Sequence, residues 1–135
     1  MRYVSLMKTR RETILAAVLA ASAWNLTLVV AAVFNAHWVL SRVDGGKFQS
    51  LPPGLRLANL GFTVLTVWVM IFAWRIWKSG GVRNPSDARW AKLVVIMYTL
   101  SAVINAISSS PNERLNAIPA AMIVGGFILL RRPVD

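Results

Sequence analysis

The distribution of apolar and charged residues divides the chain into four apolar stretches separated by short polar segments. The stretches that contain no Asp, Glu, Lys or Arg are residues 13–40, 57–74, 93–112 and 115–130. A hydrocarbon core about 30 Å thick needs about 20 helical residues to cross it, and each stretch approaches that length. The pattern therefore predicts four transmembrane helices, at about residues 13–38, 56–77, 90–110 and 113–131.

The segments between these stretches predict how the helices pack. An Asp-Gly-Gly sequence at 44–46 and the prolines at 52–53 favour a turn-rich loop after the first helix. Ser86 or Asp87 is the expected N-cap of the third helix. Residues 108–112 leave only a tight turn before the fourth helix, and helices joined in this way are antiparallel neighbours. We predict an all-α, single-domain fold, an antiparallel four-helix transmembrane bundle.

The two hairpins of this predicted bundle resemble each other weakly. Residues 32–36 (AVFNA) are similar to 102–106 (AVINA), and residues 56–59 (RLAN) are similar to 114–117 (RLNA). A duplication of this kind would give two tandem helical hairpins related by an axis along the membrane normal. Coincidence in a chain rich in Ala and Val is the alternative, and the sequence leaves both open.

Composition excludes a soluble domain and a disordered chain. Of the 135 residues, 56% are hydrophobic and 15% are charged, and the mean hydropathy is +0.56. Soluble domains carry about 25% charged residues, and disorder requires low hydrophobicity. The chain has no Cys and one His, which excludes disulfides and thiolate chemistry and leaves too few ligands for a zinc or haem site. We expect no cofactor.

The basic residues indicate topology rather than nucleic-acid binding. The net charge is +10, but the Lys and Arg residues lie in short clusters between the apolar stretches. Such clusters orient membrane proteins and attract anionic lipid headgroups. The predicted bundle places eleven basic residues on one side and four on the other, so both termini are expected in the cytoplasm. The four residues on the outer side are Arg42, Lys47, Arg56 and Arg114.

Polar residues recur at helical spacing inside the apolar stretches. Steps of three and four residues place each set on one helical face, and polar groups in a bilayer avoid the acyl chains. These faces are therefore expected to meet in the interior of the bundle. The main polar members are Asn25 and Asn35 in the first helix, Asn59, Thr63 and Thr66 in the second, Tyr98, Ser101, Asn105 and Ser108 in the third, and Asn116 in the fourth.

Polar residues gather at the outer ends of the predicted helices, and we take them as candidate ligand-binding residues. Glu113 is the one carboxylate beside a span on that side, and it could pair with Arg56 across the bundle. A structural interpretation is that these groups fix helix register through hydrogen bonds. The functional interpretation is a small outward-facing cavity for a lipid headgroup, an ion or a proton. The candidates are Glu113, Arg56, Arg114, His37, Asn35, Asn59, Asn105, Ser109 and Asn116.

No arrangement of residues in the sequence supports catalysis, because it contains no nucleophile–base pair, carboxylate pair or metal-ligand set. Small residues spaced four apart, Ala16/Ala20, Ala17/Ala21 and Ala121/Gly125, favour close helix packing. Trp24 lies mid-span and suggests contact with other protein, as does Trp68. The first hypothesis is an accessory subunit that binds another membrane protein or a second copy of itself. The alternative is a binder or carrier of a lipid or small solute, through a cavity around Glu113.

The last third of the chain resembles a known group of proteins. The sequence NAISSSPNER at residues 105–114, followed by Pro119, is similar to a pattern in small four-helix integral membrane proteins of high-GC Gram-positive bacteria. The resemblance implies four helices and a bacterial plasma membrane, and it brings no assigned activity and no catalytic residue. Small multidrug transporters have a similar size but need a Glu embedded in the first helix, and residues 13–40 contain none.

Overall fold

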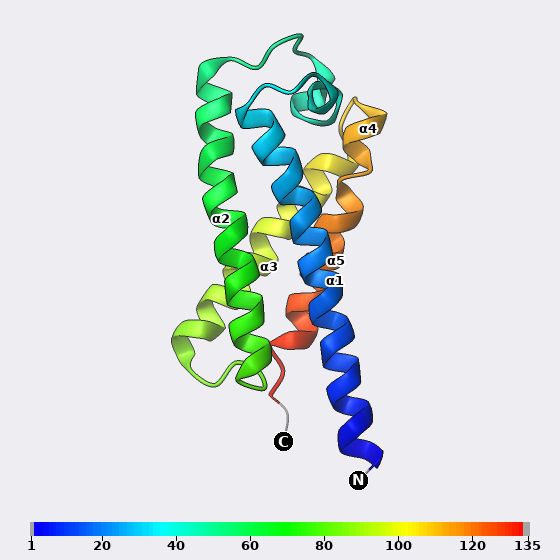
Figure 1. Cartoon of the computed structure of the whole chain (residues 1–135), viewed down its shortest axis with the longest axis vertical. Coiled ribbons are helices and arrows are strands. Elements are labelled where there is room, and N and C mark those ends of the chain that lie inside the picture. Colours follow the sequence, from blue (N-terminus) through cyan, green and yellow to red (C-terminus); the bar gives the residue numbers. More distant parts are fainter. Residues whose placement is uncertain (1, 134–135) are drawn as a thin grey trace.

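The computed structural model describes the backbone of residues 2–133 and the side chains of residues 9–133, and all regular structure within them is helical. The helices are α1 (Arg2–Val33), α2 (Pro53–Lys78), α3 (Pro85–Ala106), α4 (Pro111–Arg114) and α5 (Ala117–Leu130). Two short 3₁₀ helices, η1 (His37–Arg42) and η2 (Asp44–Gly46), lie between α1 and α2. The start of α1 and the end of α5 lie at one end of the molecule, the terminal end, and α4 lies at the other, the α4 end (Figure 1).

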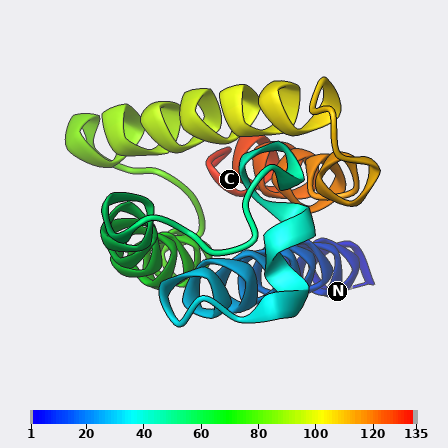
Figure 2. The same ribbon diagram turned by 90° about the horizontal axis from the view of Figure 1, so that it is seen from above.

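The four long helices form an open arrangement rather than a closed ring. Helix α1 packs against both α2 and α5, and α3 packs against α5. The antiparallel pairing of the third and fourth predicted helices is therefore confirmed. Helices α2 and α3 are consecutive in the chain but make few contacts with each other. In Figure 2, α3 extends across the molecule while α2 is seen more nearly end-on, so the two helices diverge.

A well-packed core joins the long helices. Val18, Val69, Val94, Ile123 and Phe127 come from four different helices, and none exposes any surface. A second apolar cluster at the α4 end packs η1 and the following loop against α1. In a bilayer, where lipid tails are as apolar as these side chains, van der Waals packing rather than the hydrophobic effect would hold such helices together.

The close approach of α1 and α5 occurs at Gly126. A Cβ atom on this residue would lie 2.0 Å from Val18 Cγ2, so the Val18 side chain of α1 packs directly against the backbone of α5 there. The pair predicted from spacing, Ala121 and Gly125, is instead exposed, and a Cβ on Gly125 would meet nothing within 4 Å. Ala16 and Ala20 are also exposed.

Three helices in the described part of the chain are long and apolar enough to cross a membrane. They are Thr9–Val33 within α1, the whole of α2, and the segment Pro111–Leu130 that joins α4 to α5. Helix α3 has 22 residues, but Arg89 and Lys92 in its first half lower its hydropathy, and it does not qualify. The apolar character predicted for the first, second and fourth stretches is confirmed.

The first predicted helix ends earlier than expected, at Val33 instead of residue 38. Asn35 adopts a left-handed conformation with φ 56°, which Asn tolerates better than most residues. The Ala36 N–H then donates to the Ala31 carbonyl at 2.9 Å, a bond typical of a helix C-cap. The chain turns, and residues 37–42 form η1. At its other end α1 begins at Arg2, eleven residues before the predicted start.

Helix α3 begins at Pro85 and not at the predicted residue 90, because its N-cap is Asn84. The Asn84 Oδ1 atom accepts the Asp87 N–H at 2.7 Å, and Asn84 Nδ2 donates to the Asp87 carboxylate at 2.9 Å. Pro85 follows at the first helical position, where its missing N–H costs nothing. The predicted N-caps, Ser86 and Asp87, were therefore wrong. The helix also ends earlier than predicted, at Ala106.

The fourth predicted helix, residues 113–131, is broken into α4 and α5. Pro119 has no N–H to donate to the Leu115 carbonyl, and its ring disfavours a continuous helix there. The N–H groups of Asn116 and Ile118 instead donate to carbonyls three residues earlier. Glu113 before the break and Asn116 after it are both buried.

Candidate functional site

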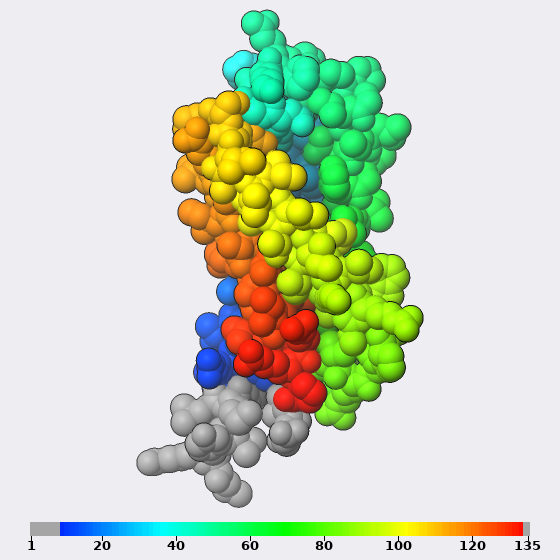
Figure 3. Space-filling model, turned by 180° about the vertical axis from the view of Figure 1, so that it is seen from behind, coloured from blue at the N-terminus to red at the C-terminus, as the bar shows by residue number. Residues whose placement is uncertain are grey.

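A cavity of about 490 Å³ opens where α2 and α3 diverge, towards the α4 end. We call it the polar cavity. Figure 3 shows a recess between α2 and α3 with atoms of α1 at its floor. Its volume lies within the range of about 300–1,000 Å³ that is usual for small-molecule sites. Its polar lining consists of Asn25, Arg42, Asp44, Asn59, Thr66, Tyr98, Ser101, Asn105, Glu113 and Asn116.

The polar faces predicted from helical spacing meet in this cavity. Asn25 of α1, Thr66 of α2 and Tyr98 of α3 all line it, and the Tyr98 side chain interacts with the other two. Thr66 and Tyr98 are buried, with 4% and 7% of their surface exposed. Three helices thus direct polar groups away from the lipid-facing side, as the pattern predicts.

Four of the nine predicted ligand-binding residues line the polar cavity, namely Asn59, Asn105, Glu113 and Asn116. Two of these are engaged locally. Asn59 Nδ2 donates to the Leu55 carbonyl at 2.8 Å, and Asn105 Nδ2 lies 3.4 Å from the Ser101 hydroxyl. The other two, Glu113 and Asn116, make the contacts that define the α4 end of the cavity.

The remaining five predicted residues lie outside the cavity lining. Arg56 Nε donates to the Val33 carbonyl at 2.7 Å, so it caps the end of α1. Arg114 Nε donates to the Ser108 carbonyl at 2.7 Å and stabilises the turn before α4. These two arginines are exposed and are held by backbone groups.

The other three predicted residues lie in or beside the loops at the α4 end. They are Asn35, Ser109 and His37. Asn35 Oδ1 accepts the Leu51 N–H at 2.7 Å and so fixes the loop that leads to α2. The Ser109 hydroxyl lies 3.4 Å from the Gly45 carbonyl. His37 is exposed at the start of η1 and is not part of the cavity lining.

Glu113 is buried, with 8% of its surface exposed, and it is satisfied by hydrogen bonds. Its Oε2 atom accepts the Gly45 N–H at 2.8 Å and the Ser108 hydroxyl. The pairing with Arg56 that seemed available from the sequence does not form. Arg56 instead donates to the Val33 carbonyl, and the only ion pair among residues 9–133 joins Arg75 to Asp87. Glu113 therefore holds η2 against α4.

Further contacts fasten residues 41–46, which we call the cap segment, to the turn around α4. The Ser110 hydroxyl donates to the Ser41 carbonyl, and Asn112 Nδ2 donates to the Ser41 hydroxyl at 3.2 Å. Asn116 Nδ2 donates to the Arg42 carbonyl at 2.8 Å. The first hairpin is thereby tied to the second, and the cap segment closes the α4 end of the polar cavity.

The Asn116 side chain is only half satisfied. Its Nδ2 atom bonds the cap segment, but its Oδ1 atom is buried and has no hydrogen-bond partner. Asn116 exposes 4% of its surface and lines the polar cavity. A buried polar atom without a partner costs about 1–3 kcal/mol, so a hydrogen-bond donor that reached this acceptor would stabilise the fold.

The two charged residues of the cap segment that line the cavity were not identified from the sequence. Arg42 and Asp44 lie in a region that the turn chemistry assigned to a simple loop. The Arg42 guanidinium lies 5.6 Å from the centre of the Trp24 ring. The available signal was the small number of charged residues on the predicted outer side, where these two lie only two positions apart.

Burial raises the pKa of Asp44 above its usual 3.8, and the negative charge of Glu113 raises it further. The ionised form of Asp44 is thus disfavoured in the folded state. Stability from this group is fully present below pH 3.8 and is lost as the pH rises through the raised pKa. Asp44 has φ 51°, which Asn accommodates equally well.

We therefore expect the Asp44→Asn variant to lose this part of the pH dependence. Relative to the wild type, its thermal midpoint in detergent should increase between pH 3.5 and pH 7, because the variant has no carboxylate whose ionisation is disfavoured beside Glu113. Circular dichroism melts over that range test the expectation. A variant whose midpoint falls relative to the wild type as the pH rises would show that ionised Asp44 stabilises the fold.

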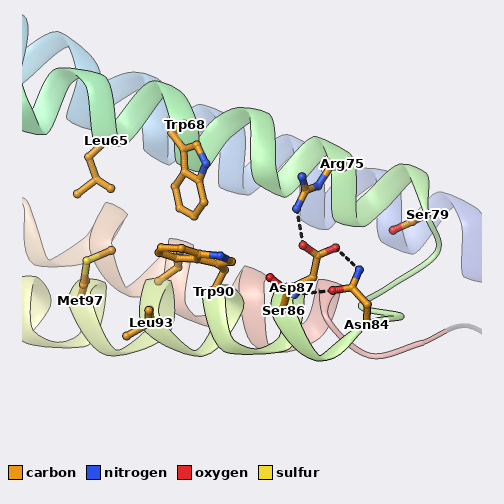
Figure 4. Close-up of a pocket in the computed structure, with 11 residues that line it drawn as sticks. Leu65, Trp68, Arg75, Ser79, Asn84, Ser86, Asp87, Trp90, Leu93 and Met97 are labelled. Carbon is orange, nitrogen blue, oxygen red and sulfur yellow. Dashed lines mark hydrogen bonds and ion pairs between the residues drawn. The ribbon is translucent and has the colours of Figure 1, made fainter.

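A second cavity of about 940 Å³ continues between α2 and α3 towards the terminal end. Trp68 and Trp90 line it and contact each other edge to face, with ring centres 5.5 Å apart, and Arg75 pairs with Asp87 (Figure 4). Leu65 and Met97 line both cavities. The two cavities therefore adjoin along the α2–α3 side, and we call the pair the α2–α3 cleft.

The mid-span tryptophans have partners within the chain. Trp68 stacks on Phe72 at 5.0 Å between ring centres and meets Trp90 edge-on, and Trp24 lies beneath Arg42. Contact with another protein is not needed to explain them. This removes one of the sequence arguments for an accessory subunit.

No family model, curated protein or solved structure matches this chain. Within residues 9–133, no group of three or more His, Asp or Glu side chains is placed to hold a metal ion. The geometry of the α2–α3 cleft is thus the basis for a functional proposal.

Proposed function

We propose that this chain is an integral membrane protein that binds an amphiphilic molecule of the bilayer in the α2–α3 cleft. The observation that carries the proposal is that polar and apolar side chains line the same cavity. Phe62, Leu65, Met97, Leu100 and Ile104 line the same cavity as the polar groups. A ligand with a polar head and an apolar tail would satisfy both parts.

The lateral position of the cleft supports a ligand that arrives from the membrane. Phe62, Leu100 and Ile104 at its edges expose 54%, 58% and 62% of their surface, which is stable where acyl chains surround them. Acyl chains could enter between α2 and α3 without the helices unpacking from α1 and α5. The proposal therefore needs no opening of the core.

We further propose that α3 also crosses the membrane, which gives four spans. Helix α3 packs along α5, and a fourth span accounts for the apolar residues that α3 exposes on its other faces. Ile96, Val103 and Ile107 expose 45%, 53% and 78% of their surface, a costly arrangement in water. The basic residues then place the terminal end in the cytoplasm and the α4 end outside. A bacterial plasma membrane fits this topology.

A cavity-filling variant tests the function. Ala58 lies on α2 and lines the polar cavity, so Ala58→Trp should occupy the space of the ligand. We expect the wild type, purified in mild detergent, to retain bound lipid in native mass spectra, and the variant to retain at least tenfold less. Val64→Trp is the matched control, because Val64 lies on α2, is 66% exposed and is not part of the cavity lining. Equal lipid retention by both variants would refute the proposal.

A second candidate is the accessory subunit, and one observation favours it. The side of α1 that faces away from the core exposes several small side chains at helical spacing beside Trp24, which is 40% exposed, and small residues would let another helix approach closely. A protein that remains monomeric and captures no partner in mild detergent would count against this candidate. The exposed small residues are Thr13, Ala16, Ala20, Ala23 and Thr27.

A further inference from the structure

The polar cavity has a local charge opposite to that of the whole protein. The chain carries a net charge of +10, but the charged groups that line this cavity are two carboxylates, Glu113 and Asp44, and one guanidinium, Arg42. The two carboxylates lie close enough to affect each other electrostatically. Such a pair disfavours an added anion and favours a cation between them.

The hydrogen-bonding groups at the α4 end of the cavity also favour a donor-rich ligand. The Gly45 N–H and the Ser108 hydroxyl are already directed to Glu113, and Arg42 Nη1 lies 3.4 Å from the Asn112 carbonyl. The Oδ1 atom of Asn116, in contrast, is a buried acceptor without a partner. A complementary ligand must therefore supply an N–H or O–H group.

We propose that the polar cavity holds the primary ammonium headgroup of a membrane lipid, with Glu113 and Asp44 balancing its charge and Asn116 Oδ1 accepting one of its N–H groups. A primary ammonium is a compact cation with three donors and no acceptor, which matches the groups on offer. Arg42, which lines the same cavity, would bind the lipid phosphate, and the acyl chains would lie along the α2–α3 cleft against Leu65 and Met97. This inference rests on the proposed function.

Other common headgroups match less well. A quaternary ammonium carries the charge but has no N–H for Asn116, and such groups are usually bound by cages of aromatic rings. A glycerol headgroup offers hydroxyl donors, but its lipid has a net negative charge that the two carboxylates repel. Both are therefore expected to bind more weakly than an ethanolamine headgroup.

The test is native mass spectrometry of the full chain with phosphatidylethanolamine, phosphatidylglycerol and phosphatidylcholine of identical acyl chains. We expect phosphatidylethanolamine to bind at least tenfold more tightly than either of the others. The preference should fall to within about threefold in Glu113→Gln and in Asp44→Asn, while Glu12→Gln, an exposed carboxylate on α1 far from the cavity in sequence and in space, should keep it. Thermal melts identify any variant that fails to fold.

The outcomes separate this inference from the function on which it rests. Equal binding of all three lipids, still abolished by Ala58→Trp, would overturn the headgroup assignment and leave the lipid site in place. A preference that survives both carboxylate variants would also overturn it. Free ethanolamine that competes as well as the whole lipid would support ammonium recognition but overturn the lipid function. Binding of none of these probes would overturn both.

Discussion

Replacing Gly126 by alanine should destabilise the protein by about 3 kcal/mol, at the upper end of the usual cost of overpacking. The added Cβ would lie 2.0 Å from Val18 Cγ2, whereas carbon atoms pack at about 3.5–4.0 Å. Val18 is fully buried, and a β-branched side chain in a helix has one strongly preferred rotamer. Relief would require α1 and α5 to separate, and reversible unfolding in mixed detergent micelles would measure the cost.

The neighbouring glycine provides the control. A Cβ on Gly125 meets nothing within 4 Å, so Gly125→Ala should be neutral or stabilising by up to about 1 kcal/mol, because alanine favours the helix. Val18→Ala should rescue Gly126→Ala, since it removes the atom that clashes. If both glycine variants have the same stability, the α1–α5 contact is not as close as the structure places it.

The same two glycines show where sequence reasoning stops. Spacing alone finds small residues four apart, and it selected Ala121 and Gly125, which face outward. Helix α5 is apolar on all sides, so no polar face indicates which side packs against α1. Successive residues on a helix point about 100° apart, and the correct glycine is the next one along the chain.

Polar stripes were predictable because they do mark a face. Asn25, Thr66 and Tyr98 lie in otherwise apolar segments. Because a polar group against lipid is costly, it determines which face of each helix points to the interior of the bundle. Their convergence could therefore be predicted from spacing, and the structure confirms it. The cap segment could not be predicted, because Asn35 ends α1 through a left-handed backbone conformation that an apolar pattern does not reveal.

The contacts of the charged residues at the α4 end could not be predicted from the sequence, for a related reason. Glu113 and Arg56 are both long side chains at helix starts, and their pairing depends on the loops between the helices. Once Asn35 turns the chain, the cap segment brings a backbone N–H to Glu113, and Arg56 is left beside the exposed carbonyl of Val33. Backbone groups, which sequence patterns do not display, thus replace the expected ion pair.

Removing the Glu113 side chain should release the cap segment while leaving the helices packed. Two hydrogen bonds to a carboxylate hold Gly45 and Ser108, and each such bond contributes about 1.5–3 kcal/mol. We expect Glu113→Ala to accelerate amide hydrogen exchange of residues 41–46 by a factor of about 10²–10³, which corresponds to about 3–4 kcal/mol. Exchange in the core around Val69 and Phe127 should change far less, because neither residue contacts the cap segment.

Glu113→Gln separates the two roles assigned to this side chain. Its amide oxygen can still accept from Gly45 and Ser108, so exchange of the cap segment should accelerate by only about 10–30-fold, because a neutral acceptor bonds about half as strongly as a charged one. Ser109→Ala is the matched control, since its contact with Gly45 is long, at 3.4 Å, and its loss should change exchange little. If Glu113→Gln loosens the cap segment as much as Glu113→Ala does, the negative charge itself is needed to hold the segment. If it keeps the segment closed but loses the lipid preference, the charge serves the ligand and the hydrogen bonds serve the fold.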